Sequence, residues 1–161
     1  MNNSPSCRIK QAIVLFEKIP YSLIAFIARF SIAAVFWKSG QTKVEGFAID
    51  LVSGTFQLGE PSLAASTLPL FRSEYHVPLI SPEVAAHMAA FAEHFFPVLI
   101  LAGFATRFSA LALIGMTLVI QLFVYPDAYP THGTWLALLL LLVAKGSGCL
   151  SIDHLIARRY R

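Results

Sequence analysis

An apolar stretch from Pro82 to Phe104 constrains this chain most, because it carries two ionisable residues near its centre. The stretch is long enough to cross a bilayer as a helix, which takes about 20 residues. Its middle holds Glu93 and His94, and His87 lies two turns earlier. A charged side chain at the bilayer centre costs about 2.5–3.5 kcal/mol on insertion scales. The chain must therefore supply a partner for these groups or give them a function.

The composition indicates that lipid is the main solvent of this chain. Hydrophobic residues make up 57% of the sequence and charged residues only 13%, whereas soluble domains have about 25% charged residues. The net charge is +3, but the basic residues flank apolar segments and form no patch with interleaved aromatic residues. We therefore expect the lipid bilayer as the principal partner and no nucleic acid.

Four apolar segments predict an all-α, polytopic membrane protein, folded as a four-transmembrane-helix bundle. The predicted spans cover residues 20–37, 82–104, 108–125 and 131–149, within a domain of residues 19–156. The fourth span has the weakest signal, because its strictly apolar run is short. Residues 1–18 are expected to form a cytoplasmic segment. Its apolar residues between Ile9 and Phe16 favour either a short interfacial helix or an extension of the first span.

The connection between the first two spans, residues 38–82, is long and rich in Gly and Pro. Connections of this length without any secondary structure are uncommon in compact domains. We therefore expect a short helix around Ser62 to Tyr75, packed against the outer mouth of the bundle. Lys38 and Lys43 follow the first span directly, and we expect them to meet lipid head groups.

Basic residues predict the orientation of the spans. With both termini inside, the inner side would hold eight basic residues and the periplasmic loop three. The inner set is Arg8, Lys10, Lys18, Arg107, Lys145, Arg158, Arg159 and Arg161, and the outer set is Lys38, Lys43 and Arg72. This distribution supports an N-in, C-in topology, with residues 157–161 as a basic cytoplasmic tail.

Arg29 is the partner that the sequence offers to Glu93. Both residues lie near the middle of an apolar span, at similar depth on the first and second helices. A guanidinium and a carboxylate that face each other would form charge-assisted hydrogen bonds. Such a pair could simply hold two helices in register, or it could line a polar cavity for a ligand head group or a proton.

The remaining polar candidates are His87, His94, Gln121 and Trp135, which could contribute to the same cavity. His87 and His94 share a helix face, but one helix cannot place two imidazoles on opposite sides of a haem iron. We therefore expect no metal or haem site. Arginine, histidine and carboxylate groups in an apolar cleft can instead bond the carbonyls of a quinone. No P-loop, dinucleotide fingerprint, HExxH or GxSxG motif is present, so no catalytic residue is assigned.

Four short groups of residues together resemble the DoxX family of small four-helix membrane proteins, over roughly residues 25–156. They are Arg29 with Phe36, Gly40 and Lys43; the segment 71–78 leading to Glu93 and Pro97; Gly103 with Thr106 and Arg107; and the segment 146–153. This chain has Ser147 where the family often has proline, which should alter only a turn.

The resemblance implies a multi-pass protein of the bacterial inner membrane, associated with redox chemistry and with quinone-linked enzymes. Soluble or membrane redox partners are implied, but no agreed catalytic set. We therefore expect a redox-associated subunit that binds a quinone or similar ligand near Arg29, Glu93 and His94. Two alternatives stay open: a non-enzymatic anchor or export partner of a peptide- or metal-handling system, and a small proton-coupled transporter. Whether the protein is itself an enzyme, and whether it forms a homo-oligomer, also stays open.

Overall fold

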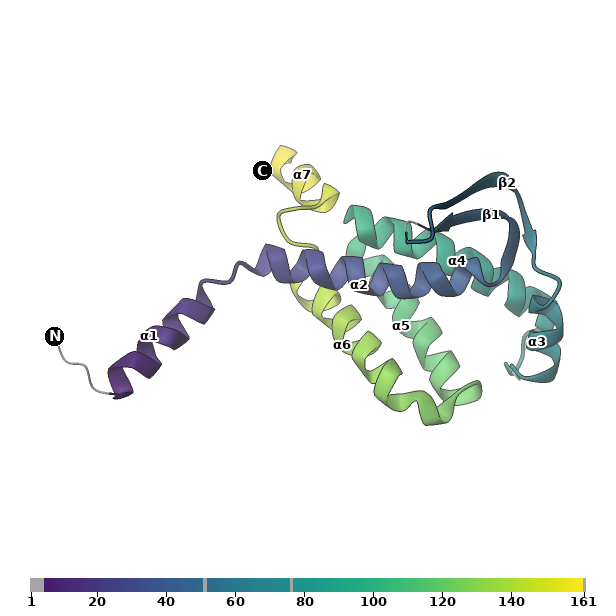
Figure 1. Ribbon diagram of the computed structural model, residues 1–161, viewed down its shortest axis with the longest axis horizontal. Coiled ribbons are helices and arrows are strands. Elements are labelled where there is room, and N and C mark those ends of the chain that lie inside the picture. The colour runs from purple at the N-terminus through teal and green to yellow at the C-terminus, as the bar shows by residue number, and fades with distance from the viewer. Residues whose placement is uncertain (1–4, 51, 76, 161) are drawn as a thin grey trace.

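The computed structural model describes residues 5–50, 52–75 and 77–160 of the chain (Figure 1). Its long helices are α2 (Tyr21–Gln41), α4 (Pro82–Ala102), α5 (Thr106–Phe123) and α6 (Tyr129–Lys145). The 3-10 turn η1 (Pro126–Ala128) joins α5 to α6. Shorter elements precede, interrupt and follow this set: α1 (Pro5–Glu17), β1 (Val44–Asp50), β2 (Thr55–Leu63), α3 (Thr67–Ser73) and α7 (Ile152–Arg159).

The core of the bundle forms where apolar side chains of α2, α4, α5 and α6 meet. Along α2 the buried residues recur with helical spacing, from Ala25 through Ile32 and Phe36 to Gly40. Many of them are small, which lets neighbouring helices approach closely. Ile32 and Phe36 pack in one cluster with apolar residues of the other three helices, among them Ile100, Leu113 and Leu139. This packing fixes the relative positions of the four helices.

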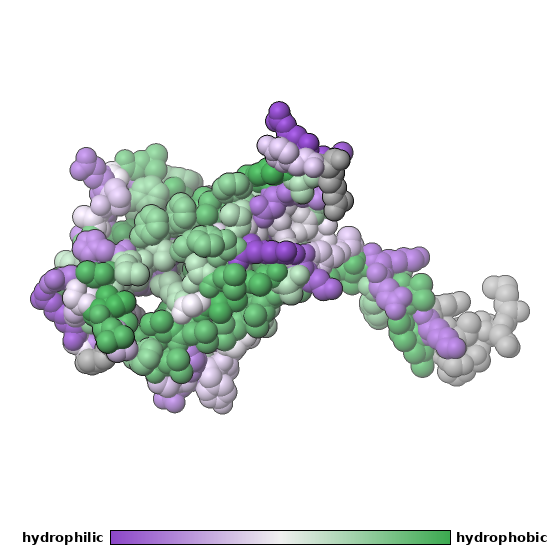
Figure 2. Space-filling model, turned by 180° about the vertical axis from the view of Figure 1, so that it is seen from behind, coloured by the Kyte–Doolittle hydropathy of each residue, from purple (hydrophilic) through white to green (hydrophobic). Residues whose placement is uncertain are grey.

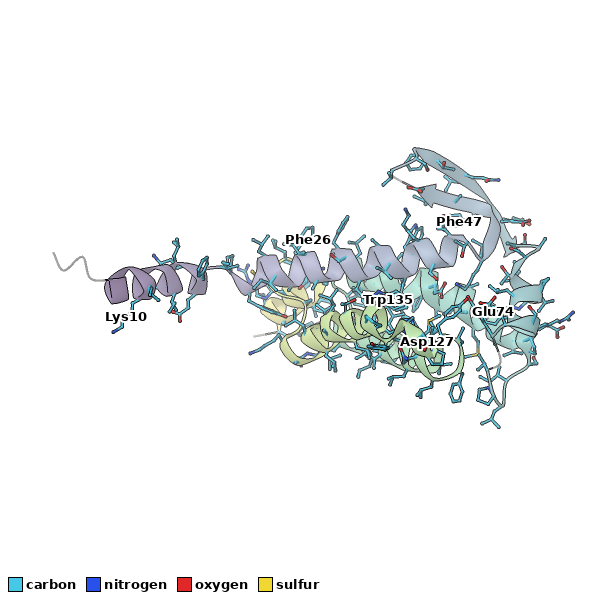
Figure 3. All side chains as sticks on the ribbon, turned by 60° about the horizontal axis from the view of Figure 1, so that its bottom comes forward. Lys10, Phe26, Phe47, Glu74, Asp127 and Trp135 are labelled. Carbon is cyan, nitrogen blue, oxygen red and sulfur yellow. The ribbon has the colours of Figure 1, made fainter. Side chains whose placement is uncertain are left out.

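The outer faces of the helices are apolar, as expected for contact with lipid. Figure 2 shows apolar side chains spread over the helical body, with hydrophilic residues concentrated toward its ends. Phe26 projects away from the bundle and is 43% exposed, whereas Trp135 lies inside it (Figure 3). In the described part of the chain, α2, α4 and α5 are long and apolar enough to cross a membrane, and α6 is slightly shorter at 17 residues. The chain is thus a membrane protein with at least these three apolar helices.

The connection after α2 contains a β-hairpin, which corrects the expectation of an all-α fold. Strands β1 and β2 pair antiparallel, with an irregularity between Glu45 and Phe47. At that point Gly46 has a φ of +82°, and a Cβ there would collide with the Glu60 carbonyl. A residue with a side chain is strained at such a φ, so Gly46 permits the bulge.

The helix expected around Ser62 to Tyr75 is present as α3. It buries Phe71 against Ala85 and Ala86 at the start of α4. At the other end of the molecule, the helix expected near Ile9 to Phe16 is part of α1, which extends away from the bundle (Figure 1). Residues 18–20 separate α1 from α2, so α1 is not a continuation of that helix.

Asp153 stabilises the turn that connects α4 to α5 at one end of the bundle. Gly103 adopts the left-handed conformation, with φ +69°, and ends α4. Asp153, at the start of α7, accepts hydrogen bonds from the backbone N–H groups of Ala105 (2.8 Å) and Thr106 (3.0 Å). These donors begin α5 and have no partner within that helix. Helix α7 thus begins within the predicted domain, where Asp153 caps α5, and extends into the predicted basic tail of residues 157–161.

Candidate ligand-binding site

Lys43 and Glu93 form a buried ion pair between the end of α2 and the middle of α4. The Lys43 Nζ donates to Glu93 Oε2 at 2.7 Å, and the two side chains are 9% and 2% exposed. Lys43 also donates to the Ser39 hydroxyl at 3.0 Å and, more weakly, to the Ser39 carbonyl at 3.3 Å. The ammonium therefore has three oxygen partners, and the Glu93 carboxylate has its counter-ion inside the protein.

The hairpin and α3 keep Lys43 in this position. The Lys43 carbonyl accepts from the Ala64 N–H at 2.9 Å and from the Thr67 hydroxyl at 3.0 Å. At Gly40, one turn before Lys43, a Cβ would lie 3.0 Å from Glu93 Cβ and 2.8 Å from His94 Cε1. Only a glycine lets the two helices approach this closely without displacement. The separation of α2 and α4 therefore brings the ammonium within reach of the carboxylate.

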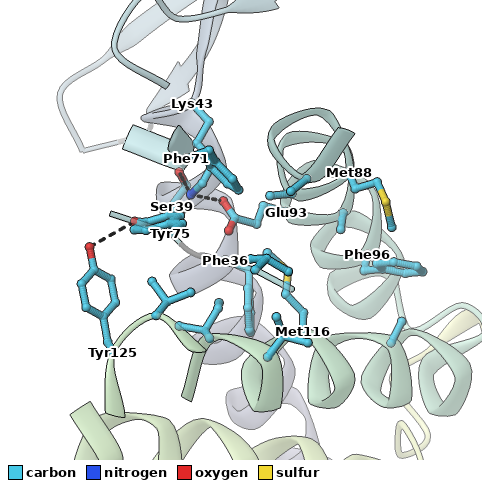
Figure 4. A pocket seen from close by; sticks show the side chains of 18 of the residues that line it. Phe36, Ser39, Lys43, Phe71, Tyr75, Met88, Glu93, Phe96, Met116 and Tyr125 are labelled. Atoms are coloured by element: carbon cyan, nitrogen blue, oxygen red, sulfur yellow. Dashed lines mark hydrogen bonds and ion pairs between the residues drawn. The ribbon is translucent and has the colours of Figure 1, made fainter. Parts of the chain in front are cut away.

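A cavity of about 420 Å³ extends from this pair into the space between α4 and α5 (Figure 4). The two helices meet at the turn after Gly103 and diverge from it in Figure 1. Most of the wall is apolar, with Phe36, Met88, Phe96 and Met116 among its side chains. The charged groups on the wall are those of Lys43 and Glu93. The cavity thus suits a ligand with an apolar body and a small polar head.

Two tyrosines line the cavity at the η1 and α3 side. The hydroxyls of Tyr75 and Tyr125 lie 3.2 Å apart, and Tyr125 donates to Glu74 at 2.6 Å. That bond, with a smaller contribution from Tyr75, raises the pKa of Tyr125. Their rings pack edge to face, with centroids 5.5 Å apart. This contact ties the α3 region to the end of α5 beside the cavity (Figure 4).

The predicted pair between Arg29 and Glu93 is wrong, because Glu93 binds Lys43 instead. Arg29 donates to the carbonyls of Leu101, at 2.8 Å, and of Leu150. Side chains on a helix lean toward its N-terminus. Since α2 and α4 are antiparallel, Arg29 leans toward the end of α4, and Glu93 leans toward Lys43. Similar depth along the two helices therefore does not bring these side chains together.

Arg29 instead donates hydrogen bonds to backbone carbonyls at the C-terminal end of α4. The last carbonyls of a helix have no partner within it and carry partial negative charge, so a guanidinium is favourable there. The Arg29 side chain is 1% exposed, and its Nε has no partner among the described residues. Gly103 faces this guanidinium, and a Cβ at Gly103 would lie 2.5 Å from Arg29 Nη1. Arg29 thus lies outside the cavity wall.

His94 connects the hairpin to the helices through hydrogen bonds and does not line the cavity. Its Nδ1 lies 2.7 Å from the Ala90 carbonyl, which can only accept, so Nδ1 carries the proton. Its Nε2 accepts from the Gln41 amide at 2.8 Å, and the Gln41 carbonyl oxygen accepts from the Ile49 N–H at 2.7 Å. The chain of bonds runs from β1 through α2 to α4. His94 is therefore a structural link in this arrangement.

The other predicted site residues are divided between the cavity and separate contacts. Trp135 lines the cavity and packs against Phe36, with ring centroids 5.4 Å apart. Gln121 instead bonds His132 at 2.7 Å and the Pro126 carbonyl at 2.6 Å, which closes the η1 turn. His87 is exposed and bonds the Glu83 carbonyl of its own helix. Of the six candidates, Glu93 and Trp135 lie on the cavity wall.

The described residues include no group of three or more His, Cys, Asp and Glu side chains arranged to hold a metal ion. Lys43 and Ser39 are polar residues of the cavity wall that sequence reasoning did not assign to the site. Their i, i+4 spacing places both on the face of α2 that also carries Phe36. That spacing, extended past the apolar run, was the signal that could have identified them.

Comparison with known proteins identifies the family of this chain. The model of the DoxX family matches residues 24–126. An uncharacterized protein of Haemophilus influenzae is 33% identical over 90 residues, which cover 51% of this chain and 60% of the relative. The alignment therefore spans less than two thirds of that relative's length. No solved structure matches the chain. Since the family model covers more than half of the sequence, including Arg29, Lys43 and Glu93, the chain belongs to the DoxX family.

Proposed function

We propose that this protein binds a quinone, or a lipid-soluble molecule of similar shape, in the cavity beside Lys43 and Glu93, as a redox-associated membrane subunit. One observation carries the proposal: a largely apolar cavity of about 420 Å³ has a single charged end, formed by a buried ion pair. Ligand pockets in proteins are typically apolar clefts of about 300–1,000 Å³ with a few convergent polar groups. The cavity has this character.

The groups at the charged end suit both oxidation states of a quinone. The hydrogen bond from Lys43 Nζ to the Ser39 carbonyl is long, at 3.3 Å, and therefore weak. A ligand carbonyl could replace the Ser39 carbonyl at little cost in free energy. The Glu93 carboxylate is an acceptor, so it could receive the hydroxyl of a quinol. Apolar and aromatic wall residues, such as Phe96 and Trp135, would cover the ring. A bound quinone would supply the electron-carrying chemistry, and the protein would orient its polar head.

The proposal includes the placement of the protein in the membrane. We propose that α6 is a fourth span, with both termini cytoplasmic and the hairpin periplasmic, in a bacterial inner membrane. The 17 residues of α6 give a length of about 26 Å, close to the thickness of a thin bilayer core, about 27 Å. The eight-to-three distribution of basic residues supports the same orientation.

Fluorescence of Trp135 tests the proposal directly. The chain has two tryptophans, so Trp37→Phe leaves Trp135, on the cavity wall, as the sole fluorophore. The full-length variant in lipid nanodiscs should show saturable quenching by a short-chain ubiquinone analogue. Ala89→Phe, which fills the cavity, should abolish saturation, whereas Ala144→Phe on the exposed face of α6 should not.

Quenching that rises linearly without saturation, or that is unchanged by Ala89→Phe, would contradict the proposal.

The other functions left open by the sequence give different results. A stable complex with soluble proteins and no quinone binding would favour an anchor or export partner. Proton flux into liposomes that is lost in Glu93→Gln would favour a transporter.

A further inference from the structure

A second cavity, of about 600 Å³, lies on the other side of the α2–α4 pair, under the hairpin. Its wall on α2 runs from Phe30 through Trp37 to Gln41, a face opposite to the one that carries Phe36 and Lys43. Its wall on α4 is formed by Pro97, Val98 and Leu101. This groove is separate from the quinone site proposed above, and the inference does not depend on that site.

The inner part of the groove has the size and chemistry of an acyl-chain site. Ala33 and Ala34 form its floor on α2, and their small side chains leave space between the larger Phe30 and Trp37. The wall from Phe30 to Lys38 spans eight residue-to-residue steps, or about 12 Å of helix. One leaflet of a bilayer core is about 15 Å deep. A single acyl chain could therefore lie along most of this wall.

The mouth of the groove carries one cation and one anion, Lys38 and Asp50. The two groups do not form a direct ion pair, although both line the same cavity. The other polar residues of the mouth already have hydrogen-bond partners within the protein. Gln41 bonds His94 and Ile49, and the Thr42 hydroxyl donates to the Ser39 carbonyl. Lys38 has no hydrogen-bond or ion-pair partner among the residues that the structure describes.

The turn of the hairpin fixes the position of Asp50. Its Oδ1 accepts from the backbone N–H groups of Val52, at 2.8 Å, and Ser53, at 3.3 Å. These bonds, of which the one from Val52 is the stronger, lower the pKa of Asp50 below its usual value. The mouth therefore presents a fixed negative charge on the hairpin and a positive charge at the last turn of α2.

We propose that this groove binds a phospholipid with a zwitterionic ethanolamine head group. Its phosphate would contact Lys38, its primary ammonium would contact Asp50, and one acyl chain would lie between α2 and α4. A primary ammonium can donate hydrogen bonds to a carboxylate, whereas the quaternary ammonium of choline has no N–H to donate. A phosphatidylglycerol head group could satisfy Lys38 alone. The two opposite charges therefore favour phosphatidylethanolamine over phosphatidylglycerol and phosphatidylcholine.

Native mass spectrometry of the full-length protein tests the site. The detergent-solubilised protein would be equilibrated with equal amounts of phosphatidylethanolamine, phosphatidylglycerol and phosphatidylcholine of identical acyl chains. The wild type should retain phosphatidylethanolamine preferentially. Asp50→Asn should reduce this preference about two- to fivefold, as expected for the loss of one exposed ionic contact. Lys38→Gln should instead reduce the retention of all three lipids by a similar factor, because each of them carries the phosphate that Lys38 would contact. The Asn side chain can still accept the turn bonds, so the hairpin should be retained.

Matched controls are available for both charges and for the groove itself. Lys145→Gln, in the last turn of α6, and Asp127→Asn, in η1, should leave both the retention and the preference unchanged. Ala34→Phe should reduce retention of all three lipids, whereas Ala112→Phe, in the other cavity, should not. Equal retention of the three lipids by the wild type would overturn the proposal. A preference that survives Asp50→Asn, or lipid retention that is unchanged in Lys38→Gln, would overturn it as well.

Discussion

Replacing Lys43 with Met should destabilise the protein strongly, because it leaves the Glu93 carboxylate without its counter-ion. The two side chains are 9% and 2% exposed, so water cannot take the place of the lost ammonium. Breaking a buried ion pair by removing one partner costs about 3–5 kcal/mol. For a chain of this size, about 2–4 °C of Tm correspond to each kcal/mol. The melting temperature in detergent, followed by circular dichroism, should therefore fall by about 6–20 °C.

The double variant Lys43→Met, Glu93→Leu separates the ion pair from simple loss of packing. Replacing both charges by apolar side chains removes the unpaired carboxylate, and such replacements are often neutral or stabilising. The double variant should therefore melt closer to the wild type than Lys43→Met does. Lys145→Met, at an exposed position, should change stability by less than about 0.5 kcal/mol. A Lys43→Met protein as stable as this control, or purely additive effects in the double variant, would refute the reasoning.

Three further predictions follow from the other contacts. Arg29→Met should cost at least about 2 kcal/mol in chemical unfolding, because charged hydrogen bonds to the carbonyls at the end of α4 are lost; unfolding at wild-type denaturant concentration would refute this role. Asp153→Ala should cost about 1–2 kcal/mol by the same assay, because the first N–H groups of α5 lose their cap, and Asp153→Asn should recover part of it. For the proposed topology, a cysteine introduced at position 127 should react with an impermeant maleimide in intact cells, and one at position 107 only after permeabilisation; the reverse pattern would contradict the orientation.

Apolar periodicity located the helices, because each long helix needs one apolar face for the core and another for lipid. The predicted spans 82–104 and 108–125 differ from α4 and α5 by about two residues at their ends. The first span continues to Gln41, four residues past its predicted end, because the hairpin bonds its last turn. The hairpin itself was missed, because its glycines and prolines are typical of loops. Pairing between β1 and β2 outweighs that local signal.

The candidate site was predicted only in part, because Glu93 lies inside an apolar run of the sequence and Lys43 lies after one. Glu93 was identified because a carboxylate is conspicuous among apolar residues. Lys43 was assigned to lipid head groups because it follows the span, but the chain reverses after it and α3 covers it, so it is only 7% exposed. A lysine has a long flexible stem, and its position in the sequence does not show where the ammonium ends.

The two buried cations therefore have different roles, although both lie on α2. Arg29 is held by the carbonyls at the α4 end and faces a glycine, so neither contact can change without moving the backbone. Lys43 and Glu93 lie on the wall of a cavity, and one contact of Lys43 is a long bond to a carbonyl. A ligand that enters between α4 and α5 can exchange contacts with this second group alone. Any response of the bundle to a molecule bound between α4 and α5 should for this reason begin at Lys43 and Glu93, while Arg29 keeps the opposite end fixed.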